Sequence, residues 1–383
     1  MKRIRVLIFS ATFGAGHLRA AEAILEAIRA KEPNAEIIHL DYGEFLNKTV
    51  NTVIKSTYIE LIKHTPKLWG KFYYRTSKMP PHSVFQRFLN TLGRRGILEY
   101  IHSLQPDLII CTYPTIAGVL AQLRLKQALE IPLVTVVTDY AIHSQWIHPG
   151  VDLYIVGCQE VCDGLLSRGI EKRRIKVTGI PVSPKFEVPM DRHSLSKKLG
   201  LNLERLTLLV MGGAYGVLGG TKWVSKIIAE SEAPVQAIIV CGQDEKLFKS
   251  LDTIISVTRN PILRLGYVRN VEELMTAADL IITKAGGLTV SEALTKRLPI
   301  VIFRPIPGQE EANAVFVEKI GAGIVADTGE ELERVLHRLI SQPQELIDMR
   351  RAAGQAVPGR SAERAVDYML KLVKGRKMEQ KIG

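Results

Sequence analysis

The stretch that decides the fold runs from Thr283 to Asn313 and reads T-K-A-G-G-L-T-V-S-E-A-L-T-K-R-L-P-I-V-I-F-R-P-I-P-G-Q-E-E-A-N. The largely apolar residues 279–283 predict a buried strand, residues 290–297 have helical spacing, and residues 300–303 predict the next strand. The pair Gly286-Gly287 lies between the first strand and the helix, where bare backbone N–H groups can bind a phosphate. This order predicts an α/β unit with a phosphate site.

Polar side chains accompany this unit at two places. Thr289 and Glu292 fall in the first turns of the expected helix, where a carboxylate can accept hydrogen bonds from vicinal hydroxyls such as those of a ribose. Gln309, Glu310 and Asn313 follow the next strand, where an attached sugar can lie. Thr289 and Glu292 also have the spacing of a capping box, and the glycine pair can be ordinary turn chemistry. The combination favours a nucleotide-sugar site.

Composition limits the alternatives. A chain of 383 residues predicts two domains, because single cores stop growing beyond about 250–300 residues. The net charge of +12 implies an anionic partner, which can be nucleic acid, an acidic membrane or a phosphate ligand. The four cysteines are scattered, which fits a reducing compartment. Because no apolar run approaches the ~18 residues of a spanning helix, we expect a soluble or peripherally attached protein.

A second glycine-rich turn stands near the N-terminus. Residues 6–10 predict the first strand, and Gly14, Gly16 and His17 follow it. The next expected strand ends at Asp41, which is placed like the ribose-binding acid of a dinucleotide fold. An NAD-type oxidoreductase is therefore an alternative, although Arg19 replaces the third glycine of that motif. His17 is either a structural histidine or a general base that is neutral near pH 7.

The segment 44–104 interrupts the alternation of strands and helices. Residues 47–100 contain ten Lys and Arg against two acids, so they carry +8 of the net charge, interleaved with aromatic residues. We expect a helical insertion that contacts an anionic membrane, with a solvated charged face or nucleic-acid binding as alternatives. The candidates for this contact are Lys67, Trp69, Lys71 and Arg75.

Further candidates follow the expected strand 132–137. Asp139 can orient His17 or can cap the turn, and Trp146 can line an acceptor groove. His148, two residues after Trp146, is a further candidate for contact with the acceptor. In the second half, residues 207–211 predict a strand with a glycine turn at Gly212 and Gly213. We expect an acceptor domain over residues 1–182, a linker over 183–199, a donor domain over 200–360 and a terminal helix over 361–383.

These motifs together resemble one family. The stretch 283–313 is similar to the donor motif of GT-B glycosyltransferases, in the branch of monogalactosyl- and processive glucosyl-diacylglycerol synthases. F-G-A-G-H-x-x-A-A from residue 13 resembles its N-terminal glycine loop, and T-D followed by W-x-H resembles a further motif. The resemblance covers nearly the whole chain. It implies an α/β GT-B fold of two Rossmann-like doubly wound domains facing a cleft, with the terminal helix crossing back to the first domain.

The resemblance also implies an activity. It is an inverting, metal-independent transfer of a hexose, with glucose favoured over galactose, from a UDP-sugar to diacylglycerol at the cytoplasmic face of the membrane. His17 is then the base, and Asp139 either assists it or is itself the base. The backbone at Val268 holds the uracil ring. The expected partners are a UDP-hexose, diacylglycerol and an anionic membrane surface, without nucleic acid. We expect no cofactor, because the sequence contains no D-x-D motif for a metal-bound diphosphate.

Two positions depart from the family pattern: Ser183 stands where a basic residue is frequent, and Tyr215 where relatives can have His. A diphosphate contact near Ser183 and a donor contact of the Tyr215 side chain are therefore open. The alternatives are an N-acetylglucosaminyltransferase acting on a polyprenyl-diphosphate lipid, a UDP-sugar epimerase, a non-catalytic UDP-sugar sensor and the oxidoreductase.

Overall fold

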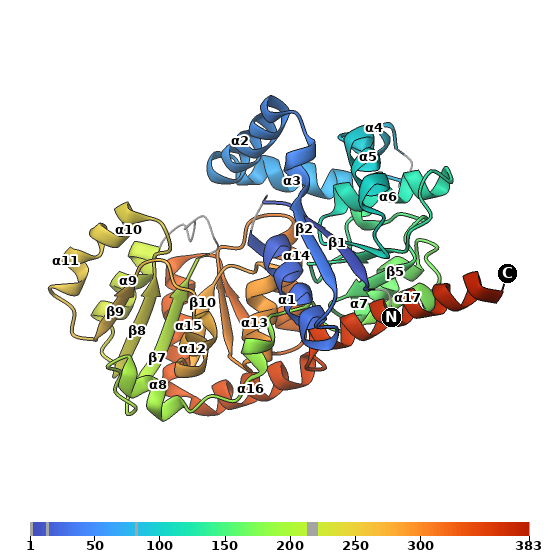
Figure 1. Ribbon diagram of the computed structural model, residues 1–383. Helices are drawn as coiled ribbons and strands as arrows, with labels where there is room; N and C mark the ends of the chain where they lie inside the picture. Colours follow the sequence, from blue (N-terminus) through green and yellow to red (C-terminus); the bar gives the residue numbers. More distant parts are fainter. Residues whose placement is uncertain (1–2, 13–14, 81–82, 213–220, 383) are drawn as a thin grey trace. The chain divides into compact units, whose positions relative to one another are not determined.

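The computed structural model describes residues 3–12, 15–80, 83–212 and 221–382. It contains two compact units (Figure 1). Unit 1 comprises Met1–Pro184 and Pro358–Gly383, and unit 2 comprises Lys185–Val357. Each unit holds a six-stranded parallel sheet with helical crossovers, so the predicted doubly wound α/β architecture is confirmed.

The sheet of unit 1 has the strand order β2-β1-β3-β4-β5-β6. Its central strands are continuous apolar runs, as expected for parallel strands covered on both faces. The strands are β1 (Arg5–Ser10), β2 (Glu36–Asp41), β3 (Leu108–Cys111), β4 (Leu133–Val136), β5 (Leu153–Val156) and β6 (Ile175–Val177). The crossover helices include α1 (Ala15–Lys31), α6 (Pro114–Leu125) and α7 (Gln159–Leu166).

The C-terminal helix α17 (Ser361–Ile382) belongs to unit 1 (red in Figure 1). It packs along α1, and its apolar side chains enter the same core as those of the sheet. Val366 and Met369, for example, lie in one cluster with Ile24 of α1 and Ile8 of β1. The end of the chain therefore completes the core of the first unit.

Four helices fill the segment between β2 and β3. They are α2 (Lys48–His64), α3 (Pro66–Ser77), α4 (Val84–Leu89) and α5 (Arg94–Leu104). The short helix η1 (Tyr42–Phe45) precedes them. In Figure 1, α2 and α3 stand at the top of the view. None of the described helices has the length and hydropathy that a membrane span requires.

The sheet of unit 2 has the order β12-β11-β10-β7-β8-β9. Its strands are β7 (Leu206–Met211), β8 (Val235–Val240), β9 (Ile262–Leu265), β10 (Leu280–Thr283), β11 (Ile300–Phe303) and β12 (Gly323–Ala326). The helices are α8 (Arg192–Lys198), α9 (Thr221–Glu230), α10 (Glu245–Ser250), α11 (Asp252–Ile255), α12 (Val271–Ala277), α13 (Gly287–Thr295), α14 (Gln309–Lys319), α15 (Gly329–Ser341) and α16 (Pro343–Ala356).

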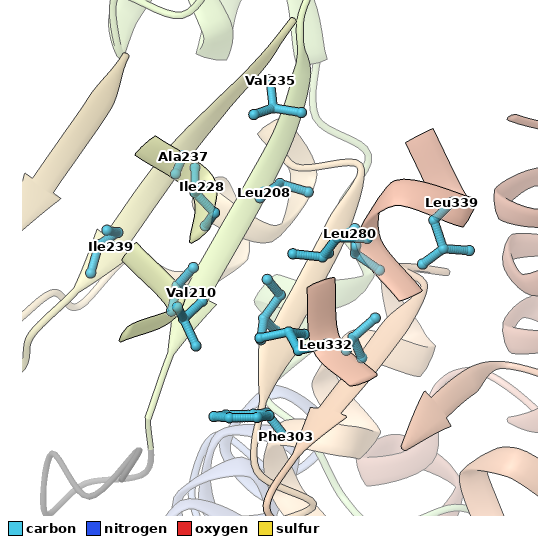
Figure 2. Packing of buried hydrophobic residues seen from close by; sticks show 14 of the residues in the cluster. Leu208, Val210, Ile228, Val235, Ala237, Ile239, Leu280, Phe303, Leu332 and Leu339 are labelled. Carbon is cyan, nitrogen blue, oxygen red and sulfur yellow. The ribbon is translucent and has the colours of Figure 1, made fainter. Parts of the chain in front are cut away.

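Alternate residues of the central strands form the core of unit 2 (Figure 2). Leu208 and Val210 of β7 point to the same face because side chains alternate along a strand. Leu332 and Leu339 of α15 pack in the same cluster. The rigid sheet that results carries the loops at its strand ends.

Residues 183–199, expected as a linker, contain helical structure. The short helix η4 (Pro184–Glu187) and α8 lie here, and from Lys185 onward the chain groups with unit 2. The Asp191 carboxylate caps α8 by accepting from two backbone N–H groups, and Arg192 pairs with Asp279 at 2.7 Å. The local polar pattern therefore reflects a capped helix and an ion pair.

Candidate active site

Both sheets have a topological switch point, where neighbouring strands send their crossovers in opposite directions. It lies between β1 and β3 in unit 1 and between β7 and β10 in unit 2. Ligands of open α/β sheets bind at the carboxyl ends of the strands at such points. His17 follows β1, and Gly286 and Gly287 follow β10, so the two principal candidate motifs lie at these positions.

His17 lies in the first turn of α1, within a group of side chains from three strand ends. Its Nδ1 is 3.0 Å from Thr138 Oγ1 beyond β4, and its backbone carbonyl accepts from Thr112 Oγ1 beyond β3 at 2.8 Å. The rings of Tyr113 and Trp146 have centroids 5.1 Å and 6.2 Å from the imidazole centroid. We call these five residues the His17 cluster.

The surroundings of His17 keep its imidazole neutral. Desolvation by burial lowers its pKa to about 4, opposed by a hydrogen bond with the backbone of Thr112. The residue nevertheless remains partly accessible to solvent. If Nδ1 carries the proton and donates it to Thr138, Nε2 holds the lone pair that can accept a proton, which is the form a general base requires.

Thr138, the neighbour of Asp139, makes a hydrogen bond with the His17 ring. Asp139 is 8% exposed, and its charge adds to the desolvation that raises the pKa of the Tyr73 hydroxyl. The role expected for Asp139 stays a prediction, and the sequence analysis did not single out Thr138. Adjacent residues at a strand end point in different directions, and the sequence alone does not say which one faces the neighbouring strand.

Asp41 has a local structural role that the sequence analysis did not anticipate. Its carboxylate accepts from Thr12 Oγ1 at 2.7 Å and from the Gly43 N–H at 2.8 Å, which caps η1. These bonds engage both of its oxygens within the turn. The oxidoreductase alternative needs this carboxylate for a ribose, so the arrangement argues against it. Gly16 is the second residue of α1, while Gly14 lies outside the described residues.

The acceptor candidates are placed differently from one another. Trp146 is 2% exposed and belongs to the His17 cluster. His148 is 4% exposed, and its backbone N–H and carbonyl are both bonded to the Tyr154 hydroxyl, at 2.8 and 2.9 Å. The His148 ring is packed in the interior, where burial lowers its pKa to about 4, and its contact with an acceptor stays a prediction.

Helix α3 presents basic and apolar side chains on one exposed face. Lys67, Lys71 and Arg75 are exposed at intervals of four residues, next to Leu68 and Phe72, which are 56% and 45% exposed. Gly70 and Thr76 lie on the opposite, buried face. Trp69 is half-buried, with its ring centroid 5.8 Å from that of Phe72. The predicted basic and aromatic residues thus form a surface that we call the α3 face.

In unit 2, the loop after β10 leads directly into α13. Gly286 is the N-cap residue of this helix. Because it is a glycine, it has no side chain that could accept hydrogen bonds from the first N–H groups of α13. A Cβ added at Gly286 would meet no atom within 4 Å, so the space beside the backbone is open. This geometry suits an anion at a helix N-terminus.

The capping-box interpretation of Thr289 and Glu292 is wrong. The helix begins at Gly287, so Thr289 is its third residue rather than its N-cap. Both residues are partly exposed. Glu292 lies within the first two turns of the helix. Its contact with a ribose stays a prediction.

The first turns of α14 hold the remaining polar candidates. Glu310 accepts from the Ile306 N–H at 2.8 Å, and Asn313 donates to the Ala285 carbonyl at 2.9 Å. Asn313 is fully buried, so in this structure it fixes the loop before α13, whereas Gln309 is partly exposed. Gly308 begins this helix with a φ of +103°, a conformation that favours glycine.

Lys284 was missed by the sequence analysis. It directly follows β10, is 9% exposed, and interacts electrostatically with Glu310. Desolvation raises the pKa of Glu310 and lowers that of Lys284, and each charge opposes the shift of the other. The signal in the sequence was a basic residue two positions before the glycine pair.

Two further predicted donor residues lie at strand ends of the same sheet. Gly212 directly follows β7, the strand beside β10, and Val268 follows β9 and is half-buried. Gly213 and Tyr215 lie outside the described residues. Unit 2 therefore brings the described donor candidates to the carboxyl edge of one sheet.

Comparison with known proteins gives two family matches. Residues 17–182 match the model described as Monogalactosyldiacylglycerol (MGDG) synthase, and residues 207–365 match the Glycosyltransferase family 28 C-terminal domain. A protein of Bacillus licheniformis, called processive diacylglycerol beta-glucosyltransferase, is 32% identical over 347 residues. That alignment covers 90% of this chain and 89% of the relative.

Solved structures agree on the architecture. Acinetobacter baumannii MurG matches with a TM-score of 0.63 at 16% identity, covering 97% of this chain and all of that one. Anabaena Alr3699/HepE in complex with UDP-glucose matches with a TM-score of 0.56 at 16% identity, covering 96% and 100%. These likenesses confirm the predicted GT-B fold.

Proposed function

Because the chain belongs to the family of processive diacylglycerol β-glucosyltransferases, we propose that it transfers glucose from UDP-glucose to a hydroxyl group of diacylglycerol. The observation that carries the proposal is the 32% identity with such a relative over 90% of the chain. The neighbouring structure that contains UDP-glucose supports the donor. The family resemblance predicted from the sequence is confirmed.

In the proposed reaction, His17 removes the acceptor's proton. The acceptor oxygen forms a bond to the anomeric carbon, the bond from that carbon to the diphosphate breaks, and UDP leaves with the electron pair. The hydroxyl proton passes to His17 Nε2, while Nδ1–H donates to Thr138. A pKa of about 4 supplies the neutral imidazole at pH 7.

The loop from Lys284 to Gly287 is proposed to bind the diphosphate. The uncapped start of α13 offers N–H groups and the positive end of a helix dipole to the negative charge that develops on UDP. Glu292 would accept from the ribose hydroxyls, and Gln309 and Glu310 would contact the sugar. Gly212 and the backbone at Val268 would complete the donor contacts.

A single displacement of this kind inverts the anomeric carbon. UDP-glucose carries an α-linkage, so attack from the opposite face gives a β-glucoside. The relatives are named beta-glucosyltransferases, which is the same configuration. A metal ion is not needed in this scheme, because the helix N-terminus and Lys284 supply positive charge near the leaving group.

The lipid acceptor is proposed to reach unit 1 from a membrane surface. The α3 face combines cations, which attract anionic lipids, with exposed apolar side chains that can enter the interface. Unit 1 would then be the acceptor unit and unit 2 the donor unit. We place the reaction at the cytoplasmic face, supported by four cysteines that are all free thiols.

Transfer of labelled sugar tests this proposal. Purified protein is mixed with vesicles of diacylglycerol and an anionic phospholipid, and UDP-glucose or UDP-galactose carrying a radiolabelled sugar is added with EDTA. We expect labelled glycolipid from UDP-glucose, with much less from UDP-galactose, and no loss on chelation. Preference for UDP-galactose would overturn the donor, loss with EDTA would overturn metal independence, and absence of lipid product would overturn the transferase.

A further inference from the structure

The loop that carries Trp146 is tied to helix α3 by buried hydrogen bonds. Ser144 Oγ donates to the backbone carbonyl of Thr76 at 2.7 Å, and His143 Nε2 lies 3.1 Å from Thr76 Oγ1. Gln86 of α4 donates to the Ser144 carbonyl at 3.0 Å. The loop after β4 and the helices of the insertion therefore form one hydrogen-bonded assembly within unit 1.

The hydrogen bonds of His143 have a defined direction. Its Nδ1 accepts from the Gln145 N–H at 3.1 Å, so the single proton of the neutral ring is on Nε2 and is donated to Thr76 Oγ1. The Thr76 hydroxyl then donates to the carbonyls of Phe72 and Tyr73, at 2.8 and 3.0 Å. Thr76 thus accepts from the loop and donates to its own helix.

This junction is buried. Thr76, His143 and Ser144 are 4%, 6% and 2% exposed. The ring of Tyr73 covers His143 at a centroid distance of 4.7 Å. Burial lowers the pKa of His143 to about 4, opposed by a hydrogen bond with the Tyr73 backbone and assisted by the charge of Arg168, so the ring stays neutral at pH 7. Losing the hydrogen bond from Ser144 Oγ to the Thr76 carbonyl would leave a buried hydroxyl without that partner, which is costly.

The junction lies between two functional surfaces. On one side, α3 carries the exposed Lys71 and Phe72 of the α3 face, one turn before Thr76. On the other side, the loop continues from His143 to Trp146, whose ring borders His17. A displacement of α3 against this loop would therefore displace Trp146.

We propose that His143 and Thr76 are positioning residues, which fix the Trp146 loop to the buried face of α3 and so couple the lipid-facing helix to the placement of His17. This inference rests on the proposed function, because His17 needs a positioned partner only if it is the base. It assigns a role to a histidine that the proposed reaction does not otherwise use.

The pH at which activity is lost on the acidic side tests this role, because a loss of stability alone would not shift the pKa of His17. Among the described residues, the groups that contact His17 are the titratable Tyr113, the neutral Thr112 and Thr138, and the Trp146 ring. Its low pKa comes from desolvation. If the loop loosens, water reaches the imidazole, and the pKa returns toward 6.5.

The test compares Thr76→Val, Thr76→Ser and His143→Asn in the full chain. Valine removes the hydroxyl at nearly constant volume, and serine restores it. Asparagine keeps an acceptor for the Gln145 N–H but cannot reach Thr76. Ser77→Ala is the matched control. Among the described residues, the Ser77 hydroxyl donates to the Tyr74 carbonyl of its own helix and makes no hydrogen bond with the loop after β4. Vesicle binding and glucose transfer between pH 5 and pH 8 are measured for each variant.

We expect T76V and H143N to lose kcat/KM by about tenfold, within the 100-fold that a 1 Å misplacement can cost. Their acidic limbs should move upward toward pH 6.5, and the double variant should lose no more than either single variant. T76S and S77A should retain the wild-type profile, and all variants should bind vesicles equally. If T76V does not fold, H143N decides the question.

Equal activity of H143N, T76V and T76S would overturn the inference, as would a loss of activity with an unmoved acidic limb. In both cases wild-type protein would still make glycolipid, so the proposed function would stand. Absence of glycolipid from the wild-type protein would overturn the function and this inference together.

Discussion

His17 lies in an environment that opposes the charge of its imidazole. Burial lowers its pKa to about 4, while Thr138 binds the other ring nitrogen at 3.0 Å. Because the proposed base acts in its neutral form, activity should be fully present above the folded pKa and should be lost as the pH falls through it. A histidine at its ordinary value would already lose activity near pH 6.5.

Replacing His17 by Ala should lower kcat by about 10²- to 10⁴-fold, the usual contribution of a general base. The wild-type enzyme should keep its kcat/KM from pH 7 down to about pH 5, with the acidic limb near pH 4. Initial rates of glucose transfer measure both effects. His102→Ala is a suitable control, because His102 is exposed on α5. An unchanged rate in H17A would exclude His17 as the base.

At the same scale, the sequence predicts positions in the fold better than individual roles. Strand–turn–helix patterns put His17, Gly286 and Glu292 after the carboxyl ends of strands, and the structure has them there. Their roles stay predictions. Asn313 proved fully buried and bonded to Ala285. Which polar residue faces a ligand and which braces a loop depends on the orientation of helix α14, and residue spacing does not determine that orientation.

Helix α3 has two distinct faces, one buried and one exposed. Its buried face holds Gly70 and Thr76, and its exposed face carries Lys67, Lys71 and Arg75 beside apolar side chains. The sequence predicted the excess of charge in the segment 44–104, but composition does not identify the exposed face. That face became apparent only with the contacts of Thr76 with the loop after β4.

Neutralising Lys67, Lys71 and Arg75 to Gln should weaken binding to anionic vesicles by about 100-fold, since each basic residue contributes about 1 kcal/mol. Co-sedimentation measures the binding, and transfer to vesicle-borne diacylglycerol should fall in parallel. The effect should diminish as salt is raised.

The matched control neutralises three other exposed basic residues of unit 1: Lys126, Lys172 and Arg173. They follow α6 or precede β6, at the amino edge of the sheet, opposite the edge where His17 lies. Because both triple variants lose the same charge, equal weakening would indicate a general effect of net charge. That result would remove the α3 face as a specific membrane contact.

For the molecule as a whole, two doubly wound sheets could be predicted because both halves alternate apolar strands with glycine turns and helices. The pattern did not predict that residues 185–199 would fold as part of unit 2, since Asp191 and Arg192 are ordinary polar residues in a sequence. The Asp191 cap is local to α8, but the ion pair of Arg192 needs Asp279, which is distant along the chain. Both sheets nevertheless carry their candidate residues at a switch point.

The anomeric configuration of the lipid product tests the central claim most directly. Glycolipid made from UDP-glucose and diacylglycerol by the wild-type enzyme is extracted, and the coupling between the protons on C1 and C2 of the sugar is measured by NMR. Inverting transfer predicts the large trans-diaxial coupling of a β-glucoside attached to the glycerol oxygen. An α-glucoside, or free glucose without any glycolipid, would contradict the account.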